Sequence, residues 1–271
     1  MQDRMKRNSG ARRSHLPNRW AGTVARVRLG ALAVSLGAAS VIESNAARAA
    51  DATAVDVSGV RHGTAADVEG NRYRTVIIGR QEWMVENLRT TRLNDGTPIP
   101  NVRDDPVWVG LTTPAYAWYA NDPVAKDTYG ALYNWFAVGT GRLAPKGWRI
   151  PSHEEWTDFL TRTLGGKSVV GGQVLMKGEL KSRRTAPDAH PRWDVPNTDA
   201  TNETEFNALP GGHRNQLGPF NLQGKIGFWW SATTSGGFAW YRGMRYDNAH
   251  VFMATGTKRN GFSVRCVRDL P

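Results

Sequence analysis

The sequence predicts an α+β domain, rich in loops, with two short helices and a C-terminal antiparallel sheet. Three observations support this prediction. A well-marked helix begins at Ser152, five short β-branched or aromatic runs follow residue 206, and stretches rich in Gly, Pro and Asn separate these segments. Helices that precede a run of strands, with long connections, are typical of α+β domains and not of alternating α/β domains.

The first segment, residues 1–49, is predicted to be a secretory signal peptide. A basic stretch precedes the uncharged apolar run 29–42, and small residues at Ala47 and Ala49 form a cleavage site. The apolar run is shorter than the ~20 residues that a transmembrane helix needs, so we expect no transmembrane segment in the mature chain. Arg12 and Arg13 keep twin-arginine export open beside the general route. We therefore expect a periplasmic, secreted or cell-surface protein.

Net charge argues against nucleic acid as a partner. The whole chain carries a formal charge of +11, but a net +7 belongs to residues 1–49, which leaves +4 for residues 50–271. A mature chain with so small an excess of basic residues lacks the strongly basic surface that nucleic-acid binding requires. The sequence leaves the oligomeric state open.

The elements of the mature chain follow in order. Residues 50–70 have little pattern and are predicted to be a linker or N-terminal arm, so that the domain spans 71–271. Two β-rich runs flank Gly79-Arg80 and predict a hairpin. Residues 129–139 have the apolar spacing of a short helix. The second helix starts at Ser152, which forms a capping box with Glu155, and it stops at Gly165.

Residues 165–202 are predicted to be a long loop region with one short helix near Leu175. The five runs that follow are predicted to be strands of one antiparallel sheet. They are "FNALPGGHRN", "GFWWSATT", "FAWYRGMRYD", "HVFMATG" and "GFSVRCVRD".

The single cysteine, Cys266, lies in the last of these runs. Its strand phase places it on one face with Phe262 and Val264, which predicts a buried core thiol. A reactive thiol and an intermolecular disulfide are the alternatives.

Seven segments together resemble the Fibrobacter succinogenes major paralogous domain family (FISUMP). They are "TVIIGRQEWMVENL", "YGALYNWFA", "PKGWRIPSHEEW", "NETEFNALPGGHRN", "GFWWSATT", "AWYRGMRYDNAHVFM" and "NGFSVRCVRD". Members are exported bacterial proteins. The resemblance implies a C-type lectin-like fold, related to that of the formylglycine-generating enzymes.

The chain departs from the family pattern at three positions. Ala144 stands where a cysteine usually precedes the proline, so the resemblance implies that Cys266 has lost a disulfide partner. His213 and Glu205 replace a common tyrosine and a common glycine. Because the formylglycine-generating enzymes depend on a pair of cysteines, we do not expect their activity here.

The ligand face implied by the resemblance is the exposed end of the C-terminal sheet with the loops beside it. Aromatic rings next to amide, carboxylate and guanidinium groups suit sugars and also suit protein partners. The candidate ligand-binding residues are Trp240, Tyr241, Arg242, Arg245, Tyr246, Asp247, Asn248, His250, Arg259 and His213. A calcium site is the candidate cofactor site, with oxygen ligands from Asn197, Asp199, Asn202 and Glu203.

The sequence thus predicts an exported, non-enzymatic binding module for an extracellular glycan or protein. Two alternatives remain open at this point. One is an enzyme on a formylglycine-generating-like fold that uses His213 and Cys266, and the other is a structural envelope protein.

Overall fold

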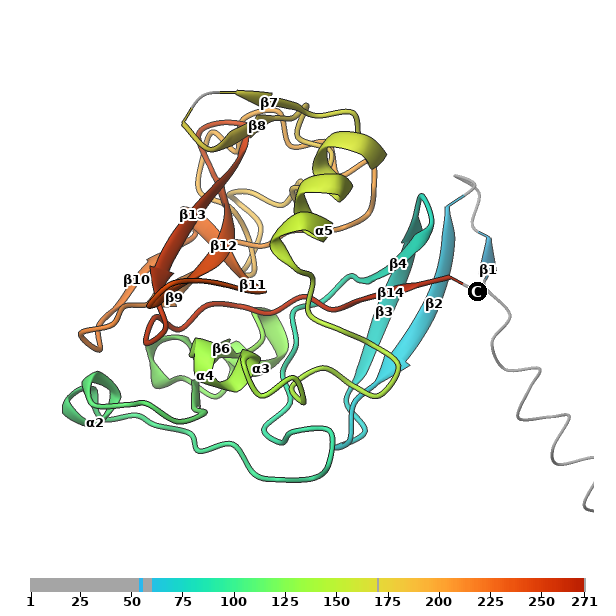
Figure 1. Ribbon diagram of the computed structural model, residues 1–271. Coiled ribbons are helices and arrows are strands. Elements are labelled where there is room, and N and C mark those ends of the chain that lie inside the picture. The colour runs from blue at the N-terminus through green and yellow to red at the C-terminus, as the bar shows by residue number, and fades with distance from the viewer. Residues whose placement is uncertain (1–53, 56–59, 170, 271) are drawn as a thin grey trace, which may run out of the picture. The chain divides into compact units, whose positions relative to one another are not determined.

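The computed structural model describes residues 54–55, 60–169 and 171–270, and Figure 1 shows their arrangement. The predicted signal peptide, residues 1–49, lies outside the described residues. Residues 51–271 form one compact unit with its own core. As the sequence predicts, this unit has few and short helices, mostly sheets, and many loops.

An N-terminal sheet is built around the hairpin that the sequence predicts. Its two-residue turn, Gly79-Arg80, pairs Ile78 with Gln81, and Gly79 takes a positive φ of 64°, which glycine adopts without strain. The strands pair antiparallel throughout. Their spatial order is β1 (Ala54–Val55), β2 (Arg61–Ala66), β3 (Arg72–Ile78), β4 (Gln81–Met84) and β14 (Val267–Asp269).

The second, larger sheet contains the β-rich C-terminal half. Its strands, in spatial order, are β10 (Phe220–Gln223), β9 (Gly211–Arg214), β11 (Ile226–Ser235), β12 (Phe238–Arg245), β13 (Val251–Thr257), β8 (Gln173–Leu175) and β7 (Lys167–Val169). All pairs are antiparallel except β9 with β11, which is parallel. A two-stranded sheet pairs β5 (Tyr116–Ala117) with β6 (Leu132–Tyr133).

The described helices are short and lie in the connections. They are α2 (Asp105–Val109), η2 (Tyr119–Asn121), α3 (Ala125–Thr128), α4 (Trp135–Val138), α5 (His153–Asp158) and η3 (Phe159–Thr163). The predicted capping box at α5 is confirmed, because Ser152 Oγ accepts from Glu155 N and Glu155 Oε2 accepts from Ser152 N. Trp156, Phe159 and Leu160 on α5 and η3 are buried and pack into the core.

Two apolar clusters meet at strand β11. Trp230 lies in one, where the tilted ring of Phe262 is 4.4 Å away between ring centroids. Trp229 lies in the other, with Trp83 and Trp156. Neighbouring residues of a strand point to opposite faces, so adjacent tryptophans serve both clusters. β11 is therefore buried on both faces.

The segment after β13 differs from its prediction. Residues 261–269 do not form one further strand of the C-terminal sheet. Gly261 and Ser263 make only isolated bridges to Arg214 of β9 and Trp229 of β11, and the chain then continues into β14, which pairs with β4 of the N-terminal sheet (Figure 1). Met84 N donates to the Cys266 carbonyl at 3.1 Å, and Arg149 N and Val267 exchange backbone bonds of 2.9 Å. Phe262, Val264 and Cys266 share a face as predicted. The opposite face is buried as well, so the segment links the two sheets.

Arg265 is the charged residue in the middle of that segment. It is fully buried, and its guanidinium donates to Asn87 Oδ1, to the Met84 carbonyl at 3.0 Å and to the Phe206 carbonyl at 2.6 Å. It also lies 4.5 Å from the centroid of the Phe206 ring. Burial lowers the pKa of Arg265 to about 9. Its hydrogen bonds join β4 and the loop that contains Phe206 to residues 261–269, which we call the linking segment.

Three local predictions need correction. Residues 61–66 of the expected arm form β2, because they pair with β3 in register from His62 to Ala66. Near Leu175 a hairpin of β7 and β8 replaces the expected helix, since Gly171 and Gly172 take positive φ values and close a turn. The expected helix at 129–139 is divided between β6 and α4, because the Asn134 side chain caps α4.

Candidate functional site

The described part of the protein has two adjoining hollows at the outer edge of β13. The larger, about 540 Å³, is lined by His153, Gly171, Gly172, Trp240, Met253, Ala254 and Thr255. The smaller, about 320 Å³, is lined by Gly171, Gln173, Arg245, Asn248, His250, Phe252, Met253 and Ala254. They share Gly171, Met253 and Ala254 at the edge of β13, and strand alternation places Trp240 and Phe252 on opposite faces, so the hollows open on the two sides of that edge. We call the two together the β13 groove.

The groove exists because β8 covers only the first part of β13. β8 pairs with Val251 and Phe252, and Met253 N donates to the Gly172 carbonyl at 2.7 Å. After this point β13 continues to Thr257 with β12 on its other side. The β7–β8 turn therefore forms one wall of the groove, and the edge of β13 forms its floor.

Trp240 and His153 form the larger hollow's aromatic wall. Alternation along β12 places Trp240 on the same face as Arg242 and Met244, which is the face that packs against α5. The imidazole ring of His153 lies 4.1 Å from the Trp240 ring, centroid to centroid. Both side chains are partly exposed. A bound molecule can therefore reach both rings.

Buried Arg242 sets the protonation state of His153. Its guanidinium donates to the His153 carbonyl at 2.8 Å and to Thr157 Oγ1 at 3.0 Å, and one NH lies 3.3 Å from His153 Nδ1. A guanidinium has donors alone, so Nδ1 must accept and a neutral ring carries its proton on Nε2. Burial and the charge of Arg242 lower the pKa of His153. His153 is thus a neutral donor at the wall of the groove.

The polar end of the groove comes from the β12–β13 turn. Asp247 accepts two bonds from Arg245, of 2.9 and 2.7 Å, and one of 3.1 Å from Asn248 Nδ2. Asn248 Oδ1 in turn accepts from His250 N at 3.0 Å. The Arg245 side chain lowers the pKa of Asp247, chiefly through its hydrogen bonds. The turn holds Arg245 and Asn248 in place at the smaller hollow.

The ten predicted ligand residues separate into three groups. Those that line the groove are Trp240, Arg245, Asn248 and His250. Arg242 and Asp247 hydrogen-bond to residues that line the groove: Arg242 to His153, and Asp247 to Arg245 and Asn248. Four lie elsewhere: Tyr241 and His213 pack against Phe228 and Phe262, Tyr246 packs against the Trp83 cluster, and Arg259 is exposed near Trp108, whose Nε1 donates to its carbonyl.

Sequence reasoning missed His153, Gln173 and Met253. The one signal for His153 was its place as the first residue of the capped helix. That signal fixes where α5 begins but not what lies beside it.

Of the four predicted calcium ligands, two make hydrogen bonds within the protein and two are exposed. Asn197 is buried and donates to the Ser182 carbonyl, and Asn202 Oδ1 accepts from Asn207 N, while Asp199 and Glu203 are exposed. Asn197 Oδ1 is buried without a hydrogen-bond partner. In the part of the chain that the structure describes, no three His, Cys, Asp or Glu side chains form a metal-binding group. The calcium site stays a prediction.

The sequence of residues 76–268 matches the Fibrobacter succinogenes major domain. This match covers most of the chain. The protein belongs to the Fibrobacter succinogenes major domain family. None of the curated proteins and none of the solved structures matches it. Over the described residues, no helix has both the length and the apolar character needed to cross a membrane.

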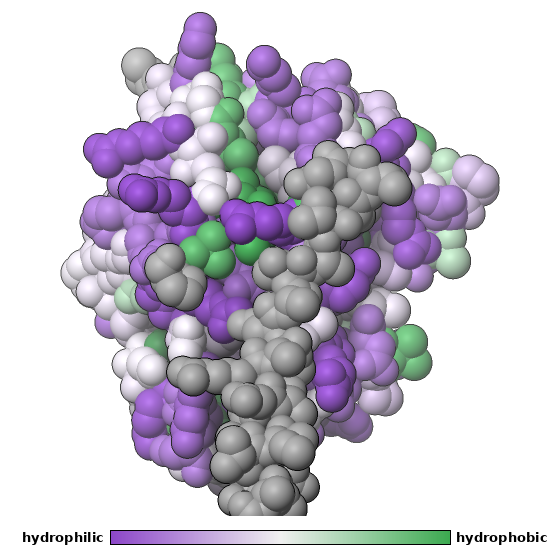
Figure 2. Space-filling view, turned by 90° about the vertical axis from the view of Figure 1, so that its right-hand side faces the viewer, coloured by the Kyte–Doolittle hydropathy of each residue, from purple (hydrophilic) through white to green (hydrophobic). Residues whose placement is uncertain are grey.

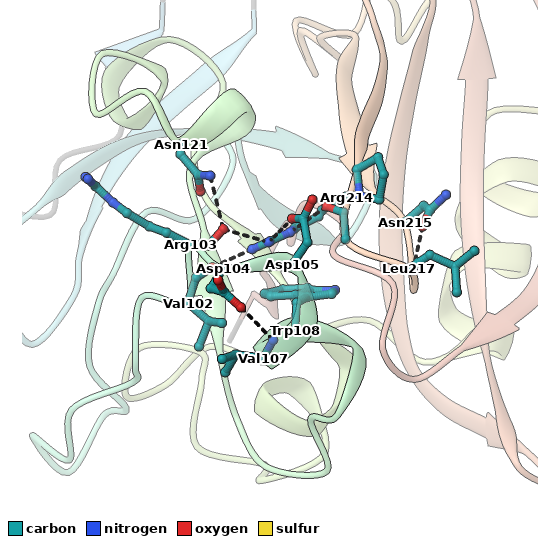
Figure 3. Close-up of polar contacts among 12 residues, drawn as sticks. Val102, Arg103, Asp104, Asp105, Val107, Trp108, Asn121, Arg214, Asn215 and Leu217 are labelled. Carbon is teal, nitrogen blue, oxygen red and sulfur yellow. Dashed lines mark hydrogen bonds and ion pairs between the residues drawn. The ribbon is translucent and has the colours of Figure 1, made fainter.

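A third buried arginine in this family member, Arg214, is a structural residue and not part of a site. Figure 3 shows it between α2 and the β9–β10 turn. Its guanidinium donates to Asp105 and to the carbonyls of Val102, Arg103 and Gly218, and it stacks 4.3 Å from the centroid of the Trp108 ring. These contacts use its donors internally, so none is directed to a ligand.

Cys266 of the family's C-terminal motif is fully buried, which confirms the predicted core thiol. Burial raises the pKa of the Cys266 thiol far above its ordinary value. Ala144, at the position of the expected cysteine partner, lies in the same apolar cluster. A protonated and enclosed thiol is not a nucleophile, so the enzyme alternative finds no support at Cys266.

We therefore expect no reaction of native Cys266 with a thiol reagent at pH 8, and one equivalent after denaturation. The measurement is absorbance with a chromogenic disulfide reagent, before and after addition of guanidinium chloride. A full equivalent within minutes under native conditions would revive the reactive-thiol alternative.

Glu205, where a glycine is common in the family, takes a left-handed φ of 55°. Its Oε2 lies 2.8 Å from His62 Nε2 on β2. Both line a third hollow, of about 360 Å³, with Gly63, Arg74, Val85, Asn202 and Asn207. This hollow lies on the side of the N-terminal sheet, and Figure 2 shows that hydrophilic residues dominate that side. A non-glycine residue in this conformation costs ~1 kcal/mol, which the partly exposed His62–Glu205 pair offsets in part.

A double-mutant cycle tests this balance. In a His62→Ala background we expect Glu205→Gly to raise the free energy of unfolding by about 1 kcal/mol, because it removes strain and no partner is left to lose. In the unaltered protein the same change should raise the free energy of unfolding by a smaller amount. The difference between the two values is the energy of the His62–Glu205 pair. Urea denaturation of the four variants measures both values, and equal effects in the two backgrounds would mean that the pair contributes nothing.

Proposed function

We propose that this protein is an exported, non-enzymatic binding module that holds a carbohydrate in the β13 groove. The observation that carries the proposal is the partly exposed Trp240 ring beside a neutral histidine donor in a hollow. Each of the two hollows has the size of sites that bind small ligands. An extracellular glycan is the ligand class that this chemistry favours.

The two parts of the groove suit the two kinds of surface on a sugar. The apolar face of a pyranose ring packs on an aromatic ring, as the Trp240 side chain offers. Hydroxyl groups take hydrogen bonds from amide, imidazole and guanidinium donors, which Gln173, Asn248 and Arg245 supply at the smaller hollow.

Export and a C-type lectin-like fold belong to the same proposal. The predicted signal peptide supports export, and the family membership supports the fold expectation. N-terminal sequencing of the protein collected outside the cytoplasm tests export, with Ala50 as the expected first residue. An uncleaved N-terminus would contradict it.

The first experiment is a glycan array together with a cell-wall pull-down, using residues 50–271. We expect binding to a restricted set of glycans. Phe238→Ala is the matched control for Trp240→Ala, because Phe238 lies two residues earlier on the same face of β12, is exposed and does not line the groove. Silence on every glycan and on cell-wall material would overturn the proposal and favour a protein ligand.

We expect stability to fall as the pH drops below about 6.5, the ordinary pKa of histidine. Since the folded-state pKa of His153 is lowered, the unfolded chain binds the proton first, and stability is lost on acidification. His153→Gln should flatten the part of the pH profile that comes from this residue. Melting temperatures between pH 7 and pH 5 measure the difference, and identical profiles would exclude His153 as its source.

A further inference from the structure

Lys181 is enclosed at the base of the turn that carries the groove's polar end. Its side chain is 1% exposed. Its ammonium nitrogen lies 2.9 Å from the Thr198 carbonyl oxygen, 3.0 Å from that of Arg245 and 2.9 Å from that of Asn248. An ammonium has three hydrogens, so each of them has its own carbonyl acceptor.

The surroundings of this ammonium are those of a cation site. The indole ring of Trp193 lies 5.3 Å from the nitrogen, within the range of a cation–π contact. Burial lowers the pKa of Lys181 to about 8, while the charges of Asp199 and Asp247 act in the opposite direction. The group is therefore charged at neutral pH.

The carbonyl oxygens of Thr198, Arg245 and Asn248 form a cage around the Lys181 nitrogen. The size of this carbonyl cage fits an ammonium and not calcium. Calcium–oxygen distances are ~2.3–2.6 Å, which is shorter than the 2.9–3.0 Å found around the Lys181 nitrogen. One wall of the cage is Thr198, which lies within the loop that the sequence offered for calcium. The other two walls belong to the β12–β13 turn.

We infer that Lys181 is a tethered cation that fills a monovalent-cation site and positions the polar end of the β13 groove. The residues that give their carbonyl oxygens to the ammonium, Arg245 and Asn248, are the ones whose side chains line the smaller hollow. Thr198 N also donates to the Tyr246 carbonyl at 2.9 Å, so the loop and the turn are joined at a second point. Ligand binding is then independent of free metal. The positioning part of this inference rests on the proposed function, whereas the cation site stands without it.

Chemical rescue tests the cation site. Lys181→Ala removes a propylammonium group and leaves the cage without its cation. We expect its melting temperature to fall, and to recover in part with millimolar n-propylammonium chloride but not with sodium chloride at equal ionic strength. The matched control is Lys225→Ala, a change at an exposed lysine, which should melt like the unaltered protein. A folded Lys181→Ala variant that propylammonium does not stabilise would overturn the inference.

Two measurements on the unaltered residues 50–271 decide the matter if the variant does not fold. Melting temperatures with calcium and with chelator should be equal, and a rise with calcium would contradict a site already filled by lysine. Acetylation with a succinimidyl ester, followed by peptide mass spectrometry, should label the exposed Lys146 and Lys225 and leave Lys181 unlabelled. Labelling of all three at one rate would also overturn the inference.

The binding measurement separates this inference from the proposed function. If a glycan is found, its affinity for Lys181→Ala should fall and should rise again with propylammonium. If no glycan binds, the proposed function fails while the thermal rescue still decides the cation site. Rescue of stability without rescue of affinity would overturn the positioning role alone.

Discussion

Replacement of Arg265 by methionine should lower the free energy of unfolding by about 3–5 kcal/mol, because buried neutral acceptors lose a charged hydrogen-bond donor. The change removes the Arg265 donor from the carbonyls of Met84 and Phe206 and from Asn87 Oδ1, which keeps its bond from Trp229 Nε1. Each buried acceptor that loses its partner costs ~1–3 kcal/mol. The relief of no longer burying a charge offsets part of that sum, so the net effect stays below the total of the three.

Guanidinium denaturation followed by tryptophan fluorescence measures this prediction. Arg80→Met is the control, because Arg80 is an exposed arginine at the β3–β4 turn, and its replacement should change the free energy of unfolding by less than ~0.5 kcal/mol. A change of less than ~1 kcal/mol for Arg265→Met would mean that the apolar packing of the linking segment, and not its hydrogen bonds, joins the two sheets.

Replacement of Trp240 by alanine should weaken glycan binding by about 10–100-fold, the loss expected for an aromatic residue at the centre of a binding surface. The ring forms the larger hollow with His153 and is partly exposed, so its removal takes away the stacking surface but little of the core. We therefore expect the melting temperature to change much less than the affinity.

Isothermal calorimetry with the strongest glycan from the array measures the change in affinity. The control, Phe238→Ala, should bind as the unaltered protein does. Equal losses in both variants would point to a general effect on β12, and unchanged binding in Trp240→Ala would place the ligand outside the β13 groove.

Much of the local structure could be predicted from the sequence because its determinants are local. The Gly79-Arg80 hairpin depends on a turn residue with positive φ, and the start of α5 depends on two side chains three residues apart. The phase of Cys266 follows from strand alternation alone. These predictions from the sequence pattern are correct because residues that are close in the chain make the contacts that determine each feature.

The remaining features depend on partners that are distant in the chain. Residues 261–269 have the pattern of another strand of the C-terminal sheet, yet β14 pairs with β4, more than 180 residues earlier. A strand that is apolar on both faces fits between two clusters as well as it fits into one sheet. The β-branched pattern of "GFSVRCVRD" carries no information about which edge it joins.

The candidate site divides in the same way. Trp240, Arg245, Asn248 and His250 were predictable as surface candidates because they lie in one strand and its turn. His153 and Lys181 were not, because their roles arise from contacts with Trp240 and with three carbonyl groups supplied by two other segments.

By itself, the sequence determined the family, the loop-rich α+β character, the hairpin, the capped helix and the burial of the thiol. These depend on residue order, local turn chemistry and the period of apolar residues. Only the tertiary structure decided the path of β14, the groove at the edge of β13 and the enclosure of the Lys181 ammonium. The physical reason is that burial and hydrogen bonding act through space, between segments whose proximity exists only once the chain has folded.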